Sequence, residues 1–306
     1  MPTTLRTLFR HAGLKPLLAL AFGLLLFPHT ACATDDRNDA YILETSGVHS
    51  DEELLRAALE ASLPKYGPYT LSNPNFNMLR KRILQEVESG RLINITAQVT
   101  SVDWETALIP VRIPIDKGLS NFRLAMIDDR HRVELSRIGS LDQLKKLAIG
   151  VGEQWATHDI YVENGFRIVS GVSSHNGLYD MLMQGRFDYM PRSVEEAVSE
   201  SAALAGAYPH LAIEPSFALY TPAPRYFFVS PRAPRLAQRL QAGLETMIAN
   251  GDFDRYFARH YGPMIAQVGL CKRTIYRLSN ASLSAQTPFN RKQLWFDPAN
   301  AAQCGK

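Results

Sequence analysis

The stretch from Ser140 to Ser193 alternates segments typical of short helices with segments typical of buried strands. It reads as a helix, a strand that ends in a glycine-rich turn, a second helix, a strand, a third helix and a final strand. This alternation predicts a wound α/β lobe with a parallel sheet between helices. Ligands bind such lobes beyond the carboxyl ends of the strands. We therefore expect functional side chains soon after Gly150 and Asp188.

The first 33 residues have the pattern of a cleaved signal peptide. Three basic residues precede an apolar run of 11 residues, Leu17–Phe27, and Ala31–Ala33 supplies a cleavage motif of small residues. A membrane-spanning helix needs about 20 apolar residues, so this run is too short for a good anchor. We expect export and cleavage. The alternative is a lipid anchor on Cys32, although His29 stands where the lipidation signal prefers leucine.

Cleavage would leave a mature chain with balanced charge. The leader holds three of the 33 Lys and Arg residues and none of the 30 Asp and Glu residues. No excess of positive charge then remains to argue for binding nucleic acid. The eight histidines show no spacing typical of metal ligands, and we expect neither a metal site nor a cofactor.

Cleavage would also leave Cys271 and Cys304 as the only cysteines of the mature chain. In an oxidising compartment a single pair is more often bridged than free. A bridge would close a loop of about 34 residues and stabilise the fold by about 3–4 kcal/mol. Two free thiols are the alternative.

The first part of the mature chain repeats the alternation of strands and helices. We expect strands at 40–43, 69–71 and 93–96, and helices after Ser50 and after Phe76. This order predicts a second parallel sheet.

Four segments between Leu141 and Gly262 follow one another in an order that is typical of a known family. Leu141–Leu144, Ile149–Gly152 and Leu182–Asp188 follow one another at regular spacing, and Leu236–Gly262 has the pattern of two terminal helices. In this order they resemble family 3 of the bacterial periplasmic solute-binding proteins, the group that includes binders of polar amino acids. The resemblance covers Ala40–Gly262 and implies the type II periplasmic binding fold. Such an α/β protein has two lobes, each a wound, mostly parallel sheet with flanking helices, and two crossing strands form the hinge.

The resemblance also implies how the chain is divided. We expect a C-terminal extension beyond the family pattern to pack on lobe 1, held by the disulfide. The expected boundaries are 1–33 for the signal peptide, 38–118 for the first part of lobe 1, 119–213 for lobe 2, 214–263 for the return to lobe 1 and 264–306 for the extension.

The turn from Gly150 to Thr157 is the first candidate for ligand binding. It follows a strand and precedes a helix, so its backbone N–H groups are expected to face an anionic group. Gly152, Trp155 and Thr157 are the candidate residues. Trp155 either stacks on the ligand or covers the junction of helix and sheet, and Thr157 is either a ligand contact or an N-cap.

Arg192 is the second candidate, because it lies just past a strand end and its planar fork suits carboxylate or phosphate. The alternative is a salt bridge between lobes or at the surface. Arg112, Lys117 and Gly118 are the third group, in the expected first crossing.

Two anchors that the family uses for α-amino acids are not at their usual positions. Amino-acid binders carry an arginine shortly before the crossing, but residues 103–106 contain none. They also carry an acidic residue after a lobe 2 strand, where Ser193 stands here. The residues therefore favour another small polar or anionic solute.

The resemblance implies a monomeric, non-enzymatic periplasmic protein that binds a small-molecule solute and delivers it to an ABC-type transporter through a membrane permease. A signalling subunit that presents its ligand state to a membrane receptor is the alternative, with the extension as its docking element. A dehydratase-like enzyme is a third reading, for which Glu153 and His158 are the candidate acid–base residues.

Overall fold

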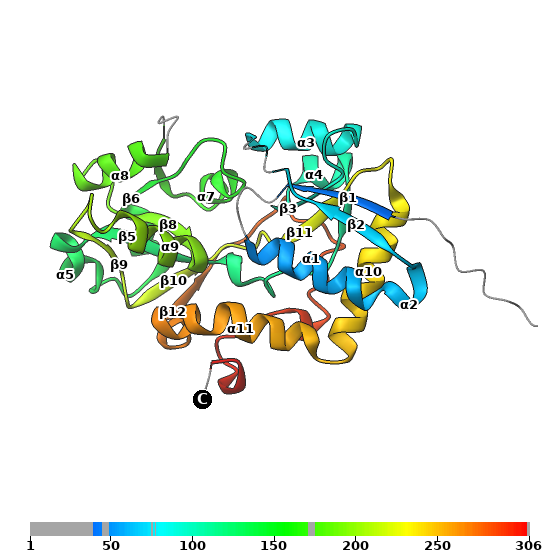
Figure 1. The fold of residues 1–306 in the computed structure, drawn as a ribbon. Helices are drawn as coiled ribbons and strands as arrows, with labels where there is room; N and C mark the ends of the chain where they lie inside the picture. Colours follow the sequence, from blue (N-terminus) through cyan, green and yellow to red (C-terminus); the bar gives the residue numbers. More distant parts are fainter. Residues whose placement is uncertain (1–38, 45–48, 75, 77, 171–174, 305–306) are drawn as a thin grey trace, which may run out of the picture. The chain divides into compact units, whose positions relative to one another are not determined.

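The structure, a computed structural model, describes residues 39–304 except 45–48, 75, 77 and 171–174 (Figure 1). The expected signal peptide and Cys32 lie outside the described residues. Two larger β-sheets, each with its own helices, define two lobes within the described chain. None of the described helices combines the length and the hydropathy needed to cross a membrane.

The first lobe contains a five-stranded sheet in the order β2-β1-β3-β11-β4. Strand β1 runs parallel to β2 and β3, whereas β11 runs antiparallel to β3 and β4. The strands are β1 Asp39–Glu44, β2 Tyr69–Ser72, β3 Ile95–Val99, β4 Ile109–Val111 and β11 Arg225–Val229. The helices are α1 His49–Ala61, α2 Leu63–Tyr66, α3 Arg80–Ser89, α4 Val102–Ala107 and α10 Pro234–Ala249. The three strands and two helices expected in the first part of the mature chain are confirmed.

The second lobe contains a sheet in the order β12-β10-β5-β8, with β9 paired to β5, and a two-stranded sheet of β6 and β7. The strands are β5 Phe122–Asp128, β6 Ala148–Gly150, β7 Arg167–Val169, β8 Met190–Ser193, β9 Leu211–Ile213, β10 Phe217–Tyr220 and β12 Thr274–Arg277. The helices are α5 Arg132–Leu135, α6 Leu141–Lys146, α7 His158–Glu163, α8 His175–Met183 and α9 Val194–Leu204.

Strand β5 makes the second lobe less parallel than we expected. It runs antiparallel to β8, β9 and β10, whereas β6 pairs with β7 in parallel. The reason is that β5 enters from the first lobe and therefore runs against the strands that the local β-α-β alternation produces.

The backbones of α1 and α10 approach closely in the core of the first lobe. Helix α1 presents an apolar stripe inward, where Leu55 and Leu59 are fully buried. A Cβ atom on Gly243 of α10 would lie 1.9 Å from the carbonyl oxygen of Ala58 on α1. Only glycine permits this contact.

The chain crosses between the lobes twice, and Asn121 ties the two crossings together. Its side chain is fully buried and accepts a hydrogen bond from the N–H of Ala223 at 3.0 Å. Its carbonyl oxygen accepts a second bond from the N–H of Thr221 at 2.7 Å. We expected the return to the first lobe to begin at residue 214. Strand β10 still pairs with β5 of the second lobe, so the second crossing begins after Tyr220.

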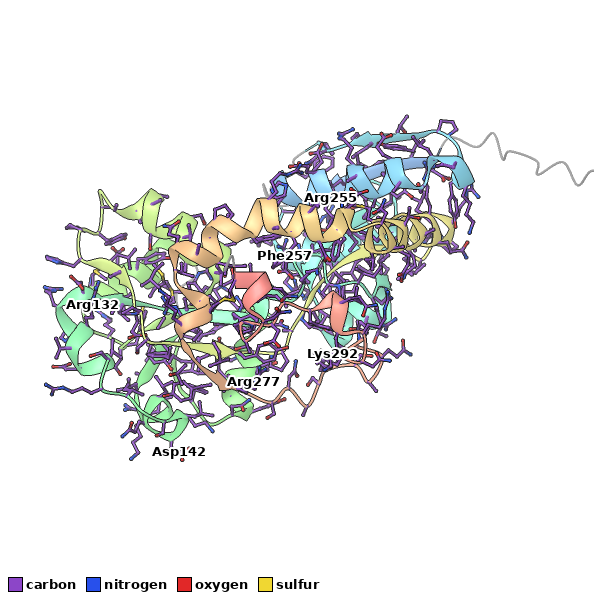
Figure 2. All side chains as sticks on the ribbon, turned by 90° about the horizontal axis from the view of Figure 1, so that it is seen from below. Arg132, Asp142, Arg255, Phe257, Arg277 and Lys292 are labelled. Atoms are coloured by element: carbon purple, nitrogen blue, oxygen red, sulfur yellow. A yellow bond between two sulfur atoms is a disulfide. The ribbon has the colours of Figure 1, made fainter. Side chains whose placement is uncertain are left out.

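The chain after helix α11 (Asp252–Gln267), called the tail below, packs on both lobes. Strand β12 joins the second sheet beside β10. The Arg291 guanidinium donates two hydrogen bonds of 2.7 Å to Glu245 of α10 in the first lobe. Figure 2 shows the tail with Arg277 of β12 and Lys292 labelled. The contact with α10 agrees with the expected packing on the first lobe, and the pairing of β12 with β10 adds a contact with the second lobe that was not expected.

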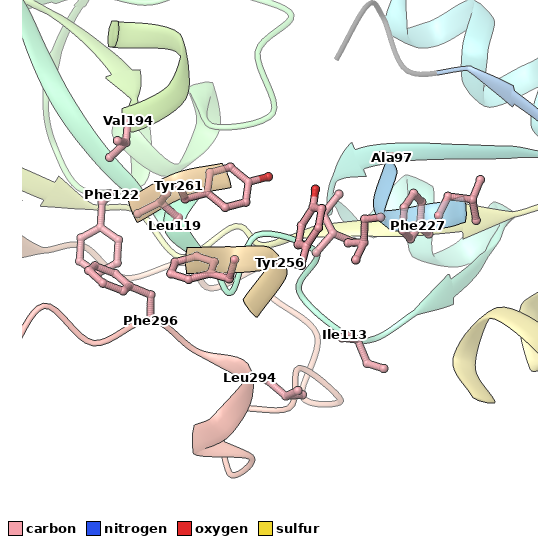
Figure 3. Close-up of a cluster of buried hydrophobic side chains, with 14 of the residues drawn as sticks. Ala97, Ile113, Leu119, Phe122, Val194, Phe227, Tyr256, Tyr261, Leu294 and Phe296 are labelled. Atoms are coloured by element: carbon pink, nitrogen blue, oxygen red, sulfur yellow. The ribbon is translucent and has the colours of Figure 1, made fainter. Parts of the chain in front are cut away.

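The tail also contributes to the core. The predicted disulfide between Cys271 and Cys304 is confirmed, and it joins the two ends of the tail. Between these ends, Phe296 is buried and packs edge-on against Phe122, with ring centroids 5.7 Å apart (Figure 3). Leu294 is fully buried in the same cluster. The tail is therefore an integral part of the fold.

Gly243→Ala tests the close approach of α1 and α10. The added methyl group would clash with the backbone of Ala58, and we expect the free energy of unfolding to fall by about 1–3 kcal/mol. Gly262→Ala in α11 is the matched control, because a Cβ atom there meets nothing within 4 Å. Because Pro263 follows, its ring disfavours a helical residue with a Cβ atom at position 262 and offsets the usual gain in helix propensity, so we expect a smaller shift there. The midpoint of urea unfolding should therefore fall further in Gly243→Ala than in Gly262→Ala, and equal shifts would contradict the packing.

Candidate functional site

A cavity of about 550 Å³ lies between segments of the two lobes and the tail. One wall is α4 with the two residues before it and Arg112, the second is α7 with Ala156 of the preceding turn, and the third is the tail. The lining residues are Thr100, Ser101, Val102, Asp103, Glu105, Thr106, Arg112, Ala156, Asp159, Ile160, Glu163, Asn280, Ser282, Leu283 and Ser284.

Glu105 organises the wall from the first lobe. Its Oε1 accepts a hydrogen bond from the Thr100 hydroxyl at 2.5 Å, and its Oε2 accepts one from the Arg112 guanidinium at 2.6 Å. Helix α4 is held from behind by Trp104, whose ring packs edge-on against Phe228 of β11 with centroids 5.4 Å apart. The positive charge of Arg112 is therefore balanced by Glu105 at the cavity wall.

The wall from the second lobe begins with the turn between β6 and α7. The N–H of Trp155 donates to the carbonyl oxygen of Gly152 at 3.0 Å, and the N–H of His158 donates to that of Trp155 at 2.9 Å. The N–H of Trp155 is therefore used within the turn, and that of His158 at the start of α7. Helix α7 then brings Asp159 and Glu163 to the cavity.

Arg192 lies in a buried network of the second lobe and does not line the cavity. Its Nε donates a hydrogen bond to Glu200 Oε2 at 2.8 Å, and its Nη2 lies 3.1 Å from Glu196 Oε1. Its guanidinium lies 4.5 Å from the ring centroid of Trp155. Gly152 leaves room for this indole, because a Cβ atom on it would lie 2.5 Å from the indole Nε1. These contacts form a buried salt bridge within the second lobe, whereas the alternative stated for Arg192 was a salt bridge between lobes or at the surface.

The same network lowers the pKa of Glu196. Burial alone would raise this pKa, but Arg192 and Arg123, with hydrogen bonds from Ser193, lower it from 4.5 to about 2. Arg123 Nη1 lies 3.3 Å from Glu196 Oε2, and the N–H of Ser193 donates to that oxygen at 2.8 Å. Glu196 therefore stays ionised at neutral pH.

Lys117 and Gly118 lie in the first crossing, against α11 and the tail. Lys117 forms an ion pair with Asp254 of α11, and its carbonyl oxygen accepts a hydrogen bond from the N–H of Phe296 at 2.7 Å. Gly118 has a φ of +68°, and a Cβ atom on it would lie 2.6 Å from Cε3 of Trp295. Both residues fix the crossing, and neither lines the cavity.

A charged group at the second crossing joins the lobes directly. Arg225 at the start of β11 pairs with Asp51 of α1, and its Nη1 lies 3.7 Å from Glu195 Oε2 of α9. Burial raises the pKa of Asp51 to about 7, although Arg225 favours its charged form. The ion pairs of Arg225 therefore connect an element of each lobe.

Arg112 is the one predicted ligand-binding residue that lines the cavity. Thr157 is buried beside Ala156, which does line it. Sequence analysis missed the acidic lining residues. Their signal was present in the stretch that lacks the expected arginine, because Asp103 and Glu105 stand there. Within the described residues, no group of three or more His, Cys, Asp or Glu side chains is placed to hold a metal ion.

Arg192→Met tests the buried network. It would leave Glu196 and Glu200 without their shared cation, and we expect the free energy of unfolding to fall by about 3 kcal/mol. Urea unfolding at neutral pH measures this loss, and an unchanged midpoint would contradict the network.

Glu196→Gln tests the pH dependence of the same network. Because folding lowers the pKa of Glu196, its contribution is complete above pH 4.5 and is lost as the pH falls towards 2. The variant should be less stable than wild type at pH 6, and the difference should shrink on acidification. Glu195→Gln is the control with the opposite sign, because burial raises the pKa of Glu195. Parallel pH profiles for the two variants would contradict the assignment.

Comparison with known proteins identifies the fold. No protein-family model matches the chain, and no curated protein matches it. Solved structures do match. An ancestral arginine-binding protein bound to arginine has 16% identity and a TM-score of 0.53, covering 74% of this chain and 100% of its own.

Two further solved structures have a similar fold. The probable amino-acid ABC transporter extracellular-binding protein YtmK from Bacillus subtilis has 15% identity and a TM-score of 0.53, covering 73% of this chain and 97% of its own. A third structure is described for glutathione import through GshT and the cystine ABC importer TcyBC of Streptococcus mutans. It has 13% identity and a TM-score of 0.51, and the match covers 74% of this chain and 96% of its own. The chain therefore has the two-lobed fold of the type II periplasmic binding proteins.

Proposed function

We propose that the protein binds a small, positively charged solute in the cavity between its two lobes. The observation that carries this proposal is the cavity itself, because its lining comes from α4 of the first lobe and α7 of the second. A solute held there would contact both lobes at once. A volume of about 550 Å³ is within the usual range for small-molecule sites.

The charge of the lining favours a cation. Asp103, Asp159 and Glu163 are exposed at the cavity, whereas Arg112 is the one basic residue of the lining and is paired with Glu105. A cleft lined by one sign of charge raises the local concentration of ligands of the opposite sign. The sequence suggested a small polar or anionic solute, and the acidic lining favours a polar cation over an anion.

The comparisons support a binding role and a transport partner. The ancestral protein is bound to arginine, which is a cation, and YtmK is described as a probable extracellular-binding protein of an amino-acid ABC transporter. We infer export to the periplasm through the leader at 1–33 and delivery of the solute to a membrane permease. For an enzyme, Glu153 and His158 would have to act together, but His158 Nδ1 contacts Asp159 at 2.9 Å instead.

The proposed division of the chain into lobes follows the two larger sheets. The first lobe would comprise the chain up to the first crossing and again from β11 to α10, and the second lobe the chain between the crossings. The tail would belong to both. The docking role that the receptor alternative gave to the extension needs a separable element, and the buried Phe296 argues against one.

Calorimetry on the mature chain tests the proposed ligand class. We expect binding of at least one of L-arginine, L-lysine and putrescine, and none of L-glutamate or citrate. Asp103→Asn and Asp159→Asn should each weaken cation binding about fivefold, since one charge pair at 4 Å in water contributes about 1 kcal/mol. Asp142→Asn on α6 is the matched control, because Asp142 is also exposed but does not line the cavity (Figure 2). Binding of glutamate as tight as that of arginine would contradict the proposal.

A further inference from the structure

We infer that the tail is a fixed third wall of the solute cavity and limits the length of the solute that the protein accepts. This inference rests on the proposed function. Asn280, Ser282, Leu283 and Ser284 line the cavity together with α4 and α7. These residues lie beyond the pair of terminal helices, in the part of the chain that was expected to be an accessory extension.

Two interactions fix the tail immediately before this wall. Strand β12 pairs in parallel with β10 from Phe217↔Thr274 to Tyr220↔Arg277. The side chain of Asn164, which follows α7, then donates a hydrogen bond to the carbonyl oxygen of Ser279 at 2.8 Å. The tail is thereby anchored on the helix that forms the second wall.

The wall residue Asn280 is itself anchored at the second crossing. Its Nδ2 donates a hydrogen bond to the carbonyl oxygen of Pro222 at 2.9 Å, and its Oδ1 accepts one from the N–H of Ser282 at 3.0 Å. The Asn280 amide is thus used to shape the wall, and Ser282 is held by it.

The tail is fixed again after the wall, on the first lobe. Arg291 is bonded to Glu245 of α10, and Trp295 packs over Gly118 of the first crossing. The disulfide to Cys304 then closes the segment covalently. Anchors before, within and after the wall leave little freedom for it to move aside for a longer ligand.

The wall has no charged side chain, so it contributes shape and hydrogen bonding to the cavity. The acidic residues all belong to the other two walls. A cation held near Asp103 and Asp159 would therefore meet neutral serine and leucine side chains in the direction of the tail. The consequence is selection by length: short cations fit, and longer ones collide with the tail.

Ser284→Trp tests this wall, with Ala285→Trp as the matched control. Ser284 lines the cavity, whereas its neighbour Ala285 is exposed and does not. In Ser284→Trp we expect the longest α,ω-diamine that wild type binds to lose at least tenfold in affinity, while Ala285→Trp binds the series like wild type. Equal affinity of the two variants for that diamine would overturn the inference.

Hydrogen exchange of the ligand-free variants separates this inference from the proposed function. An indole in the cavity should slow exchange of the α4 and α7 amides in Ser284→Trp but not in Ala285→Trp. Identical exchange would overturn the wall whatever the ligand is. Slower exchange without diamine binding to wild type would support the wall and count against the proposed cationic solute. If Ser284→Trp has a lower melting temperature than wild type, Ser282→Trp on the same wall replaces it in both measurements.

Discussion

The buried side chain of Asn121 links the two segments by which the chain passes between its sheets. Its amide oxygen and its backbone oxygen accept hydrogen bonds from the second crossing, at Ala223 and Thr221. Nearby, the carboxylate of Asp116 accepts hydrogen bonds from the N–H groups of Gly118 at 2.9 Å and Ser120 at 3.1 Å. Buried polar groups bonded in this way specify one geometry, because any other arrangement leaves them unsatisfied. The positions of the cavity walls depend on this junction.

The tail adds further connections between the two lobes besides the two crossings. In a protein with two lobes joined only by crossing strands, the crossings alone would set the freedom between the lobes. Here the tail pairs with β10 in one lobe, is bonded to α10 in the other and buries Phe296 against Phe122 at the start of β5. The ion pairs of Arg225 with Asp51 and Glu195 add a further direct link. Cavity, crossings and tail therefore form one connected structure.

Local patterns in the sequence were enough to predict most elements, whereas long-range partners were not. The apolar stripe of α1 and a strand at 93–96, which the structure has at 95–99, were predictable because periodicity is a local property. Strand β12 was not, since its partner β10 lies far away in sequence and the pairing uses backbone groups. Arg192 was expected just past a strand at 185–188 but lies within β8, and its partner Glu200 is set by how α9 packs. The cavity charge was visible at Asp103 and Glu105, although an arginine was sought there.

A crystal structure grown with the tightest-binding cation tests the central claim most directly. The account predicts the cation between α4 and α7, with its positive group near Asp103 or Asp159 and its far end against Ser284. A cation bound outside this cavity, or contacts with one lobe alone, would contradict it.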